Sequence, residues 1–587
     1  MARTDPHSYA DTDHVQLTQL DWAARVFFDT RRIVATLRLG FVGSPSAPAI
    51  VDLDTRALQI RSVKLAGADL RFTLDENDVV LGERLRIELP PGAAQAGGAL
   101  DIAYEIGASA SALQWLRPSQ TAGGVLPFLF TQCQAIHARS LLPLQDSPRV
   151  RIQFRAELWV PVGFRALMAA REVDRKEVTL DGETWNVERW EMPEPIPPYL
   201  FAFAVGDLES AELGPRSRVW AEPSLLAASA HEFAETDAML CTAEKLFGPY
   251  DWERFDLLVM PPSFPYGGME NPRLTFLTPS LLAGDRSLAA VVAHELAHSW
   301  TGNLVSGASA EHFWLNEGMT VWAERRIVEA LFGRERAELD AALGRRELHH
   351  TLEGFADRPQ LTTLRTSLDG IDPDEVFSLV PYEKGYAFVR HLEEHAGREA
   401  FDRFVARYVK TYAFQSITTD EFLALVRSEL PGALHAVEAW RYVDAPGLPD
   451  NAPRASSARL SAIEALGDGV PDDEVARGFS PAEWQIYLAA LPRPYARTAE
   501  LQQRFHLLEQ GNLEIRAAFL ELALASSLPE ATAHGEQMVG AVGRMKYLKP
   551  LYAALARLDR ERTRATFERL RDRYHPIAVQ VISGLLA

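Results

Sequence analysis

Hydrophobic and polar residues alternate in several runs over the first two hundred positions, which predicts β-strands. Every second residue is apolar in the segments 33–41, 100–106 and 150–160, and side chains two positions apart lie on the same face of a strand. Glycine and proline clusters separate these runs, as turns between strands do. We therefore expect a mostly antiparallel β-domain over residues 1–205, with a boundary near Gly206-Asp207.

The pattern becomes helical further along the chain. The segment 229–247 predicts one helix that stops at Gly248-Pro249. We expect a mixed domain over residues 206–444, with a small sheet whose edge strand carries Gly267 and Gly268.

A third part is predicted to be helical throughout. Residues 445–453 have the proline-rich and glycine-containing composition of a linker. In Ser480-Pro481-Ala482-Glu483, a capping box is combined with proline at the first helical position. Together with the helical stretches that follow, this predicts a compact α-domain over residues 454–587, and so a multidomain α+β protein.

Length and composition narrow the range of partners. At 587 residues the chain is too long for one hydrophobic core and suits about three domains. Its net charge of −20 disfavours nucleic acid and anionic membranes as main partners. With only Cys133 and Cys241, a disulfide framework is not indicated, and both are expected to be buried thiols.

Neither a membrane span nor a signal peptide is expected. No apolar run approaches the length of a transmembrane helix, and the stretch from Met1 to His7 lacks the apolar core of a signal peptide. We expect a cytoplasmic protein, with a monomer favoured.

The chemically most specific run is His294-Glu295-Leu296-Ala297-His298, followed nineteen positions later by Glu317. Positions i and i+4 share a helix face, so both imidazoles can bind one metal ion. Two histidines and a carboxylate are the ligands of an open catalytic zinc site, with one zinc ion per chain. Glu295 is not needed as a ligand and is free to act as a base.

The flanks of this motif favour a buried helix over a solvated one. Residues 288–293 are apolar, and buried histidines and glutamate need partners, which a metal supplies. We expect Asp285 or Ser287 to cap the start of the helix and Gly302 to end it. Seven residues after Glu317, Glu324 faces the same way: it either accepts from a ligand histidine or pairs with a neighbouring arginine at 325 or 326.

Two further segments carry candidate chemistry. In Gly267-Gly268-Met269-Glu270, the glycines permit an extended substrate to approach an edge strand, and Glu270 offers a carboxylate to an amine. The alternative is a glycine turn with an incidental acid. Tyr382 can donate to a developing oxyanion, or can pack in the core.

Together these runs resemble the gluzincin zinc aminopeptidases, the family of alanyl aminopeptidase and leukotriene A-4 hydrolase. The finer likeness is to the leukotriene A-4 hydrolase branch and spans nearly the whole chain. It is carried by Gly-Gly-Met-Glu-Asn at 267–271, the zinc motif, Pro-Tyr-Glu-Lys-Gly at 381–385, and the branch runs at 113–116, 132–137, 262–266, 371–374 and 543–546.

The resemblance implies a thermolysin-like catalytic domain and a helical layer that closes one side of the cleft. By position, the resemblance implies that His294, His298 and Glu317 bind zinc and that Glu295 is the general base. It implies that Glu270 and Gln134 bind the substrate amine, beside Gly267, Gly268 and Met269, and that Tyr382 donates to the oxyanion. It further implies that Asp374 lines the substrate channel and that Arg544 and Lys546 bind the substrate's C-terminal carboxylate. Phe377 departs from the tyrosine of vertebrate relatives.

The residues by themselves leave some of these roles open. Gln132 and Gln134 would share a strand face and could form a hydrogen-bonded core pair instead. Arg544 and Lys546 do not share a helix face, so they would converge only at a helix end or in a loop.

We expect an aminopeptidase that acts on short peptides with a free N-terminus. The carboxylate clamp that the resemblance implies favours peptides of tripeptide size. The alternatives are hydrolysis of a leukotriene-like lipid epoxide as a side activity, and a metal-free binding scaffold. An endopeptidase is disfavoured because an internal peptide segment would leave the Glu270 charge buried and unpaired.

Overall fold

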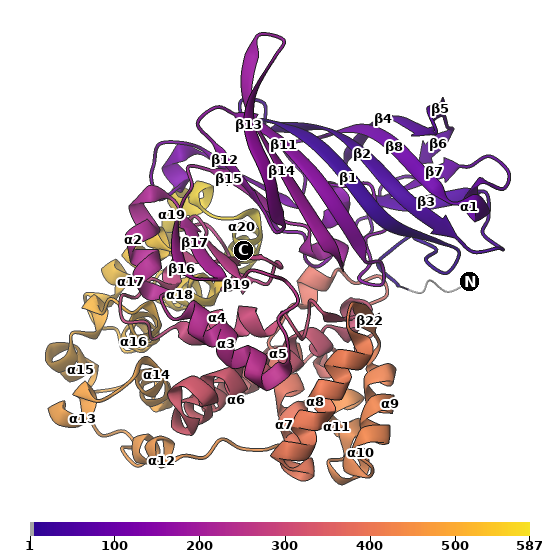
Figure 1. The fold of residues 1–587 in the computed structure, drawn as a ribbon. Coiled ribbons are helices and arrows are strands. Elements are labelled where there is room, and N and C mark those ends of the chain that lie inside the picture. The colour runs from indigo at the N-terminus through magenta and orange to yellow at the C-terminus, as the bar shows by residue number, and fades with distance from the viewer. Residues whose placement is uncertain (1–4) are drawn as a thin grey trace.

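The computed structural model describes residues 5–587, so Met1–Thr4, which belong to the stretch searched for a signal peptide, lie outside it. Three parts follow one another along the chain: strands, then mixed helices and strands, then helices alone. In Figure 1 the C-terminal helices lie against the central part, and the large N-terminal sheet covers another side of it. The expected fold class is confirmed.

The N-terminal part is built on an eight-stranded sheet in which only the β1–β11 pair is parallel. In sheet order its strands are β13 (Arg171–Leu180), β14 (Glu183–Ile196), β11 (Ile152–Pro161), β1 (Val15–Phe27), β2 (Arg32–Gly43), β8 (Gly98–Ile106), β4 (Leu58–Leu65) and β5 (Ala68–Asp69). The alternation predicted along 33–41 and 100–106 buries one face of β2 and β8.

Two smaller sheets and a short helix complete this part. They are β12 (Arg165–Met168), β15 (Phe203–Gly206), β10 (Phe128–Thr131) and β9 (Leu113–Leu116); β3 (Ile50–Thr55), β7 (Glu83–Glu88) and β6 (Phe72–Leu74); and α1 (Ala93–Ala96).

The central part holds a five-stranded sheet whose edge strand is β19, as expected for the two glycines: Gly268 lies in it and Gly267 directly precedes it. The strands are β16 (Glu209–Gly214), β17 (Ser217–Ala221), β18 (Asp256–Val259), β20 (Leu274–Leu277) and β19 (Gly268–Met269), with β21 (Val305–Gly307) paired to β22 (Gln415–Ile417). The helices are α2 (Pro223–Glu232), α3 (Thr236–Phe247), α4 (Ala289–Ala297), α5 (Trp314–Phe332), α6 (Arg334–Gly354), α7 (Gly385–Ala396), α8 (Arg398–Tyr412), α9 (Thr419–Glu429), α10 (Ala433–Ala436) and α11 (Ala439–Val443).

Two local predictions are wrong. The segment 229–247 forms two helices, α2 and α3, because Thr236 turns the chain: its hydroxyl and its amide both donate to the Phe233 carbonyl. Neither Asp285 nor Ser287 caps α4, which begins only at Ala289, and Gly302 does not end it, because the helix stops at Ala297. Asp285 instead accepts from the Ser287 amide, and the Ser287 hydroxyl accepts from Asn512 of the C-terminal part.

Every regular element from Ala458 to Leu586 is helical. The α-helices are α12 (Ala458–Glu464), α13 (Asp473–Arg477), α14 (Pro481–Ala490), α15 (Thr498–Phe505), α16 (Leu513–Ala525), α17 (Ala531–Ala541), α18 (Met545–Leu558), α19 (Arg560–Leu570) and α20 (Pro576–Leu586). The predicted capping box at Ser480 is present. These helices share a hydrophobic core that also takes in Leu339 of α6. Two hydrogen bonds join them to the other parts: Met545 N–H donates to Pro265 O at 2.9 Å, and Gln120 Nε2 donates to Asp572 O at 2.8 Å.

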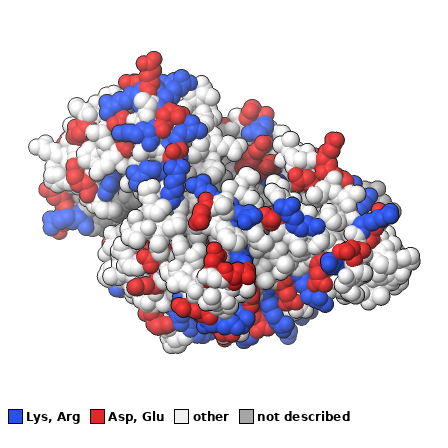
Figure 2. All heavy atoms as spheres, turned by 90° about the horizontal axis from the view of Figure 1, so that it is seen from above, with Lys and Arg blue, Asp and Glu red and all other residues white. Residues whose placement is uncertain are grey.

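Among residues 5–587, no helix combines the length and the apolar surface that crossing a membrane requires. On the face shown in Figure 2, acidic and basic side chains are interspersed.

A contact between two glycines fixes how α5 meets the start of α7. A Cβ added to Gly318 would lie 2.6 Å from Gly385 Cα, and one added to Gly385 would lie 2.7 Å from Gly318 Cα. Only glycine at both positions lets the two backbones approach this closely.

We therefore expect Gly318→Ala to lower the free energy of unfolding by about 1–3 kcal/mol, the usual cost of overpacking a close contact. Gly354→Ala is the matched control, because a Cβ there meets nothing within 4 Å. Urea unfolding of both variants and the wild type measures the difference; equal midpoints for the two variants would contradict the role of the glycine contact.

Candidate metal centre

A cleft of about 890 Å³ lies where the three parts meet. Its walls include Gln134 from the N-terminal part, Glu295 and Tyr382 from the central part, and Arg544 from the C-terminal part. All the other candidate residues, Lys546 included, also line this cleft.

Three candidate ligands converge at the base of the cleft. His294 lies on α4, His298 directly follows that helix, and Glu317 lies in the first turn of α5. The two Nε2 atoms are 3.2 Å apart and lie 3.5 and 3.4 Å from Glu317 Oε2. A tetrahedral zinc ion with bonds of 2.0–2.1 Å places its ligand atoms about 3.3–3.4 Å apart, so this triangle fits zinc.

The electrostatics of the triangle also favour a cation. Glu317 Oε2 is buried and has no hydrogen-bond partner among the described residues. Burial lowers the pKa of His294, but its contacts with Glu317 and Glu324 outweigh burial and raise that pKa well above the ordinary range. Burial raises the pKa of Glu317, yet the neighbouring His298 charge outweighs it and leaves that pKa low. Positive charge is thus stabilised at this point.

Both imidazoles are oriented through their other ring nitrogen. His294 Nδ1 lies 3.0 Å from Glu324 Oε2, and His298 Nδ1 lies 3.0 Å from the Thr301 carbonyl. Because these partners accept, each Nδ1 is the donor and each Nε2 lone pair points to the metal position. Of the two arrangements left open for Glu324, the structure has the histidine contact, since Arg325 and Arg326 bind Glu383 and Asp402.

Glu295 lies on the same helix, with its carboxylate against the backbone of β19. A Cβ on Gly268 would collide with the Glu295 side chain, so any other residue there would displace the Glu295 carboxylate. Burial raises the pKa of Glu295 to about 7, against the opposing effect of the His294 and His298 charges. A carboxyl group with this pKa can both take and return a proton near neutral pH.

Glu270 follows the edge strand and is almost fully buried. Gln134 Nε2 donates to Glu270 Oε1 at 3.2 Å, and Asn303 Nδ2 donates to the Glu270 carbonyl at 2.7 Å. Burial raises the pKa of Glu270, partly opposed by the His298 charge. The strand placement expected for Gln132 and Gln134 is wrong, because β10 ends at Thr131.

Those two glutamines lie in the turn that follows β10, and they do not form the alternative core pair. Gln132 Nε2 lies 3.2 Å from Met269 Sδ, whereas Gln134 binds Glu270, and all four residues line the cleft.

Tyr382 lies in a π-helical turn, Val380–Lys384, just before α7. Its ring stacks on His294 with 6.1 Å between centroids and lies 6.0 Å from the Phe377 ring. Burial, together with the charges of Glu317 and Glu270, raises the pKa of Tyr382. The phenol therefore keeps its proton and can donate it in a hydrogen bond.

The two candidate cations of the C-terminal part converge because they lie at a helix start. Arg544 is the N-cap of α18 and Lys546 is in its first turn. Both face Glu514, at 3.6 and 2.8 Å, and Tyr547 Oη donates to that carboxylate at 2.9 Å. Arg544 also packs on the edge-strand segment: a Cβ on Gly267 would lie 2.7 Å from Arg544 Nη2.

Asp374 lies in a 3₁₀ turn, Pro373–Val376, in the cleft wall. Its Oδ2 is 2.7 Å from His137 Nε2 of the N-terminal part.

Comparison with known proteins assigns the chain to a family. Over 99% of its length the chain is 37% identical to leukotriene A-4 hydrolase from Xenopus laevis, and it covers 98% of that protein. The chain belongs to peptidase family M1. Family models match this M1 peptidase at residues 18–200 (Peptidase M1 N-terminal domain), 232–440 (Peptidase family M1 domain) and 479–586 (Leukotriene A4 hydrolase, C-terminal).

Other relatives and solved structures are similar to the chain in sequence or in fold. This M1 peptidase is 36% identical to leucine aminopeptidase 2 from Yarrowia lipolytica, with 99% of the chain and 93% of that relative covered. It matches the structure of yeast LTA4 hydrolase in complex with bestatin with a TM-score of 0.93, 32% identity, and coverage of 100% and 98%. An M1 zinc metallopeptidase from Deinococcus radiodurans, at 20% identity, a TM-score of 0.61 and coverage of 75% and 96%, shares the fold. The family expected from the sequence is confirmed.

Sequence reasoning did not find several residues that hold this site of the M1 peptidase together. Thr320, one turn after Glu317, lies 3.2 Å from His298 Nδ1, and Glu514 and His137 contact the candidate substrate residues. The i+3 spacing from Glu317 could have indicated Thr320. Glu514 had no local signal, because its partners are thirty residues further along the chain.

We expect Glu324→Gln to weaken zinc binding by about tenfold, because the amide keeps a contact with His294 but loses the negative charge that strengthens it as a ligand. Glu329→Gln is the control on the same helix: its partner is the exposed Arg398. A chelator titration followed by metal analysis measures both variants, and equal zinc retention would remove this role of Glu324.

Proposed function

We propose that this M1 peptidase is a zinc-dependent aminopeptidase that releases N-terminal residues from short peptides, of about tripeptide size. The observation that carries the proposal is the buried Glu270 carboxylate, held by Gln134, in the same cleft as the three-residue metal site. Relatives named leucine aminopeptidase 2 that match along nearly the whole chain support the peptidase activity.

Membership of family M1 implies a catalytic zinc ion, and His294, His298 and Glu317 would hold one per chain. When bound, zinc polarises the scissile carbonyl and lowers the pKa of water in the site.

Substrate recognition begins at the free amine. A buried carboxylate binds an ammonium group strongly when no other cation occupies its remaining oxygen. Among residues 5–587, the only hydrogen bond of the Glu270 carboxylate comes from the neutral amide of Gln134. Anchoring the amine there sets the scissile bond one residue into the peptide. The edge strand at Gly268 and Met269 offers its backbone to the extended substrate.

Glu295 is the proposed general base. It takes a proton from the attacking water and returns it to the leaving amine, for which a pKa of about 7 is well suited. The Tyr382 hydroxyl donates to the oxyanion that develops on the substrate carbonyl. Both groups line the cleft, and the Tyr382 ring stacks on that of His294.

Arg544 and Lys546 would bind the substrate's C-terminal carboxylate, which favours peptides that span the distance from Glu270 to α18. Glu514 holds both cations in place. Asp374 would form a polar part of the channel.

Hydrolysis of a lipid epoxide is the second candidate, as a side activity. It is favoured by the relative named leukotriene A-4 hydrolase and by the match to the C-terminal domain of that enzyme. In this reaction Arg544 would bind the fatty carboxylate.

The proposed partners are short peptides with a free N-terminus. We propose no nucleic acid partner, because acidic and basic side chains are interspersed on the face in Figure 2 and do not form a basic patch there. A cytoplasmic monomer stays a prediction. Cys133 and Cys241 are unpaired, which suits a reducing compartment, although Cys241 is exposed and not buried as expected.

Blocking the substrate amine tests the proposal. We expect N-acetylation of a tripeptide to lower kcat/KM by a hundredfold or more, because an uncompensated buried carboxylate costs roughly 3–5 kcal/mol. In Glu270→Gln the free and acetylated peptides should differ much less. Cleavage of both peptides at the same rate by the wild type would contradict an aminopeptidase.

Replacing the base tests the chemistry separately from binding. Glu295→Gln should lower kcat by at least about a hundredfold, the usual contribution of a general base, and leave the zinc content unchanged. Glu311→Gln is the control: Glu311 lines the same cleft and accepts from the Leu368 amide, a hydrogen bond that the glutamine oxygen keeps, so this variant should keep its activity. Turnover by Glu295→Gln close to the wild-type rate would remove Glu295 from the mechanism.

A further inference from the structure

The turn that carries Tyr382 is held against α5 by a buried ion pair. Glu383, the next residue of the turn, accepts from Arg325 Nη2 at 2.7 Å. Only 11% of the Glu383 side chain and 7% of the Arg325 side chain are exposed. The glutamate belongs to the turn Val380–Lys384, and the arginine belongs to the helix that also carries Glu317. The ion pair therefore joins the turn of Tyr382 to the helix of a candidate metal ligand.

Two neighbouring sides of α5 contact the metal site and the turn. Glu317 and Glu324 are seven residues apart, and both lie against the imidazole of a candidate zinc ligand. Gly318 and Arg325 come one position later and are also seven apart. Residues at this spacing lie two turns apart on one side of a helix. Because Gly318 packs against Gly385 and Arg325 binds the turn itself, this second side of α5 sets how far the turn lies from the metal site.

Arg325 has one carboxylate partner. Its guanidinium group stacks on the Tyr386 ring, 3.8 Å from the ring centroid, and donates a further hydrogen bond of 3.3 Å to the Asp340 carbonyl. Its Nε and Nη1 atoms have no hydrogen-bond partner among residues 5–587. In that same range, Glu383 is the only carboxylate that accepts from it. Loss of the Glu383 charge would therefore leave a buried cation without a counter-charge.

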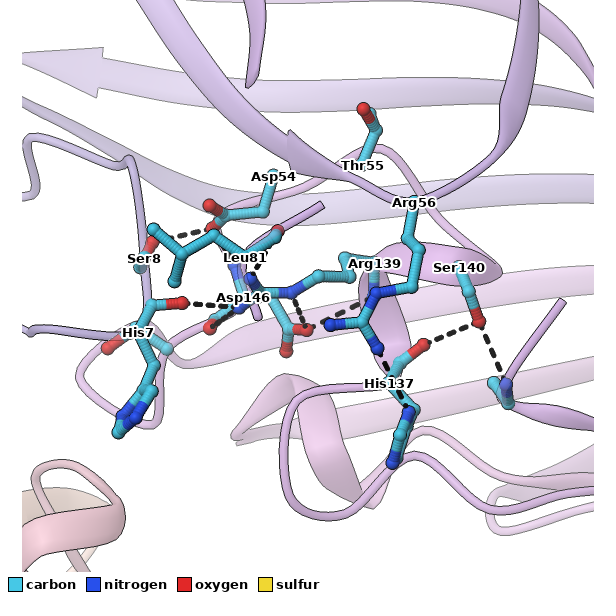
Figure 3. Close-up of polar contacts among 12 residues, drawn as sticks. His7, Ser8, Asp54, Thr55, Arg56, Leu81, His137, Arg139, Ser140 and Asp146 are labelled. Carbon is cyan, nitrogen blue, oxygen red and sulfur yellow. Dashed lines mark hydrogen bonds and ion pairs between the residues drawn. The ribbon is translucent and has the colours of Figure 1, made fainter. Parts of the chain in front are cut away.

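A second buried arginine, in the N-terminal part, is bound differently. Figure 3 shows Arg139 among several acceptors, and each of its three guanidinium nitrogens donates a hydrogen bond. The acceptors are Asp146 Oδ2 at 2.9 Å, the Leu81 carbonyl at 2.8 Å and the His7 carbonyl at 2.6 Å. Loss of one acceptor there leaves the others in place. Arg325 lacks such alternatives, so its position and that of Glu383 depend on each other.

The Glu383 carboxylate is also enclosed by α6. A Cβ added to Gly344 would collide with it. Burial raises the pKa of Glu383, and the Arg325 charge opposes this change. The Tyr382 ring contacts other rings, but its hydroxyl makes no hydrogen bond with residues 5–587. The direction of the phenol therefore depends on the ring contacts and on the turn that Glu383 fixes.

We propose that Glu383 is a positioning residue for Tyr382: its ion pair with Arg325 fixes the turn on α5 and so holds the phenol where it can donate to the oxyanion. The proposal rests on the proposed aminopeptidase function, in which Tyr382 is the oxyanion donor. Glu383 acts through Tyr382 and not on the substrate. Breaking the ion pair should therefore weaken stabilisation of the transition state and leave peptide binding at Glu270 unchanged.

Replacing the acid by its amide removes the charge and keeps the size of the side chain. Glu383→Gln should lower kcat for an unblocked tripeptide by about tenfold, a part of what an oxyanion donor contributes, and should change KM by less than about twofold. Arg325→Lys keeps the positive charge but loses the planar stack on Tyr386, and it should lower kcat by about threefold. The zinc content of both variants should equal that of the wild type.

Glu393→Gln is the matched control. Glu393 pairs with Arg326, the next residue of α5, at 3.3 Å, and 10% of its side chain is exposed. Neither of these two is among the described residues that line the cleft. The control should unfold at lower urea concentration than the wild type, as Glu383→Gln should, because both lose the negative charge of a buried pair. Its kcat should nevertheless stay within about twofold of the wild type.

A double-mutant comparison shows whether Glu383 acts through Tyr382. Tyr382→Phe removes the hydroxyl and should lower kcat by about a hundredfold or more. Adding Glu383→Gln should lower it no further, because no donor is left to position. If Glu383→Gln does not fold, Arg325→Lys takes its place in this comparison.

The proposal is overturned if the two effects multiply, if Glu383→Gln and Arg325→Lys keep the wild-type kcat, or if Glu393→Gln lowers kcat as much as Glu383→Gln does. A wild-type kcat in Tyr382→Phe would instead contradict the proposed function, because Tyr382 would then not be the oxyanion donor.

Discussion

The structure depends on one buried electrostatic requirement: two imidazole nitrogens and a carboxylate oxygen face one another within 3.5 Å. Lone pairs that converge at this distance repel unless a proton or a metal ion lies between them. The partners behind the triangle, Glu324 and the Thr301 carbonyl, take the ring protons and so leave the Nε2 atoms for a metal. Helices α4 and α5 are therefore arranged around a cation that neither helix supplies.

The shape of the rest of the cleft depends on how closely other backbone segments approach α4 and α5. Gly268 lets β19 lie against the Glu295 carboxylate, and the contact between Gly318 and Gly385 brings the turn of Tyr382 over His294. A side chain at any of these three positions would move a wall of the cleft. The N-terminal and C-terminal parts then close the space, with Gln134 on one side and Arg544 on the other.

The sequence was most informative where the signal was local and periodic. The i, i+4 spacing of His294 and His298 placed both on one helix face, and the alternation along 33–41 predicted β2. It was wrong where a side chain competed with the helix backbone, as Thr236 does between α2 and α3. Contacts between distant segments, such as His137 with Asp374, leave no trace in spacing. The domain boundaries and the chemical roles of the site residues stay predictions.

The most direct test of the account is anomalous diffraction from crystals of the purified protein, measured on both sides of the zinc absorption edge. The account predicts one strong peak per chain, about 2 Å from His294 Nε2, His298 Nε2 and a Glu317 carboxylate oxygen. A zinc peak elsewhere in the molecule, or none in protein that cleaves tripeptides, would contradict it.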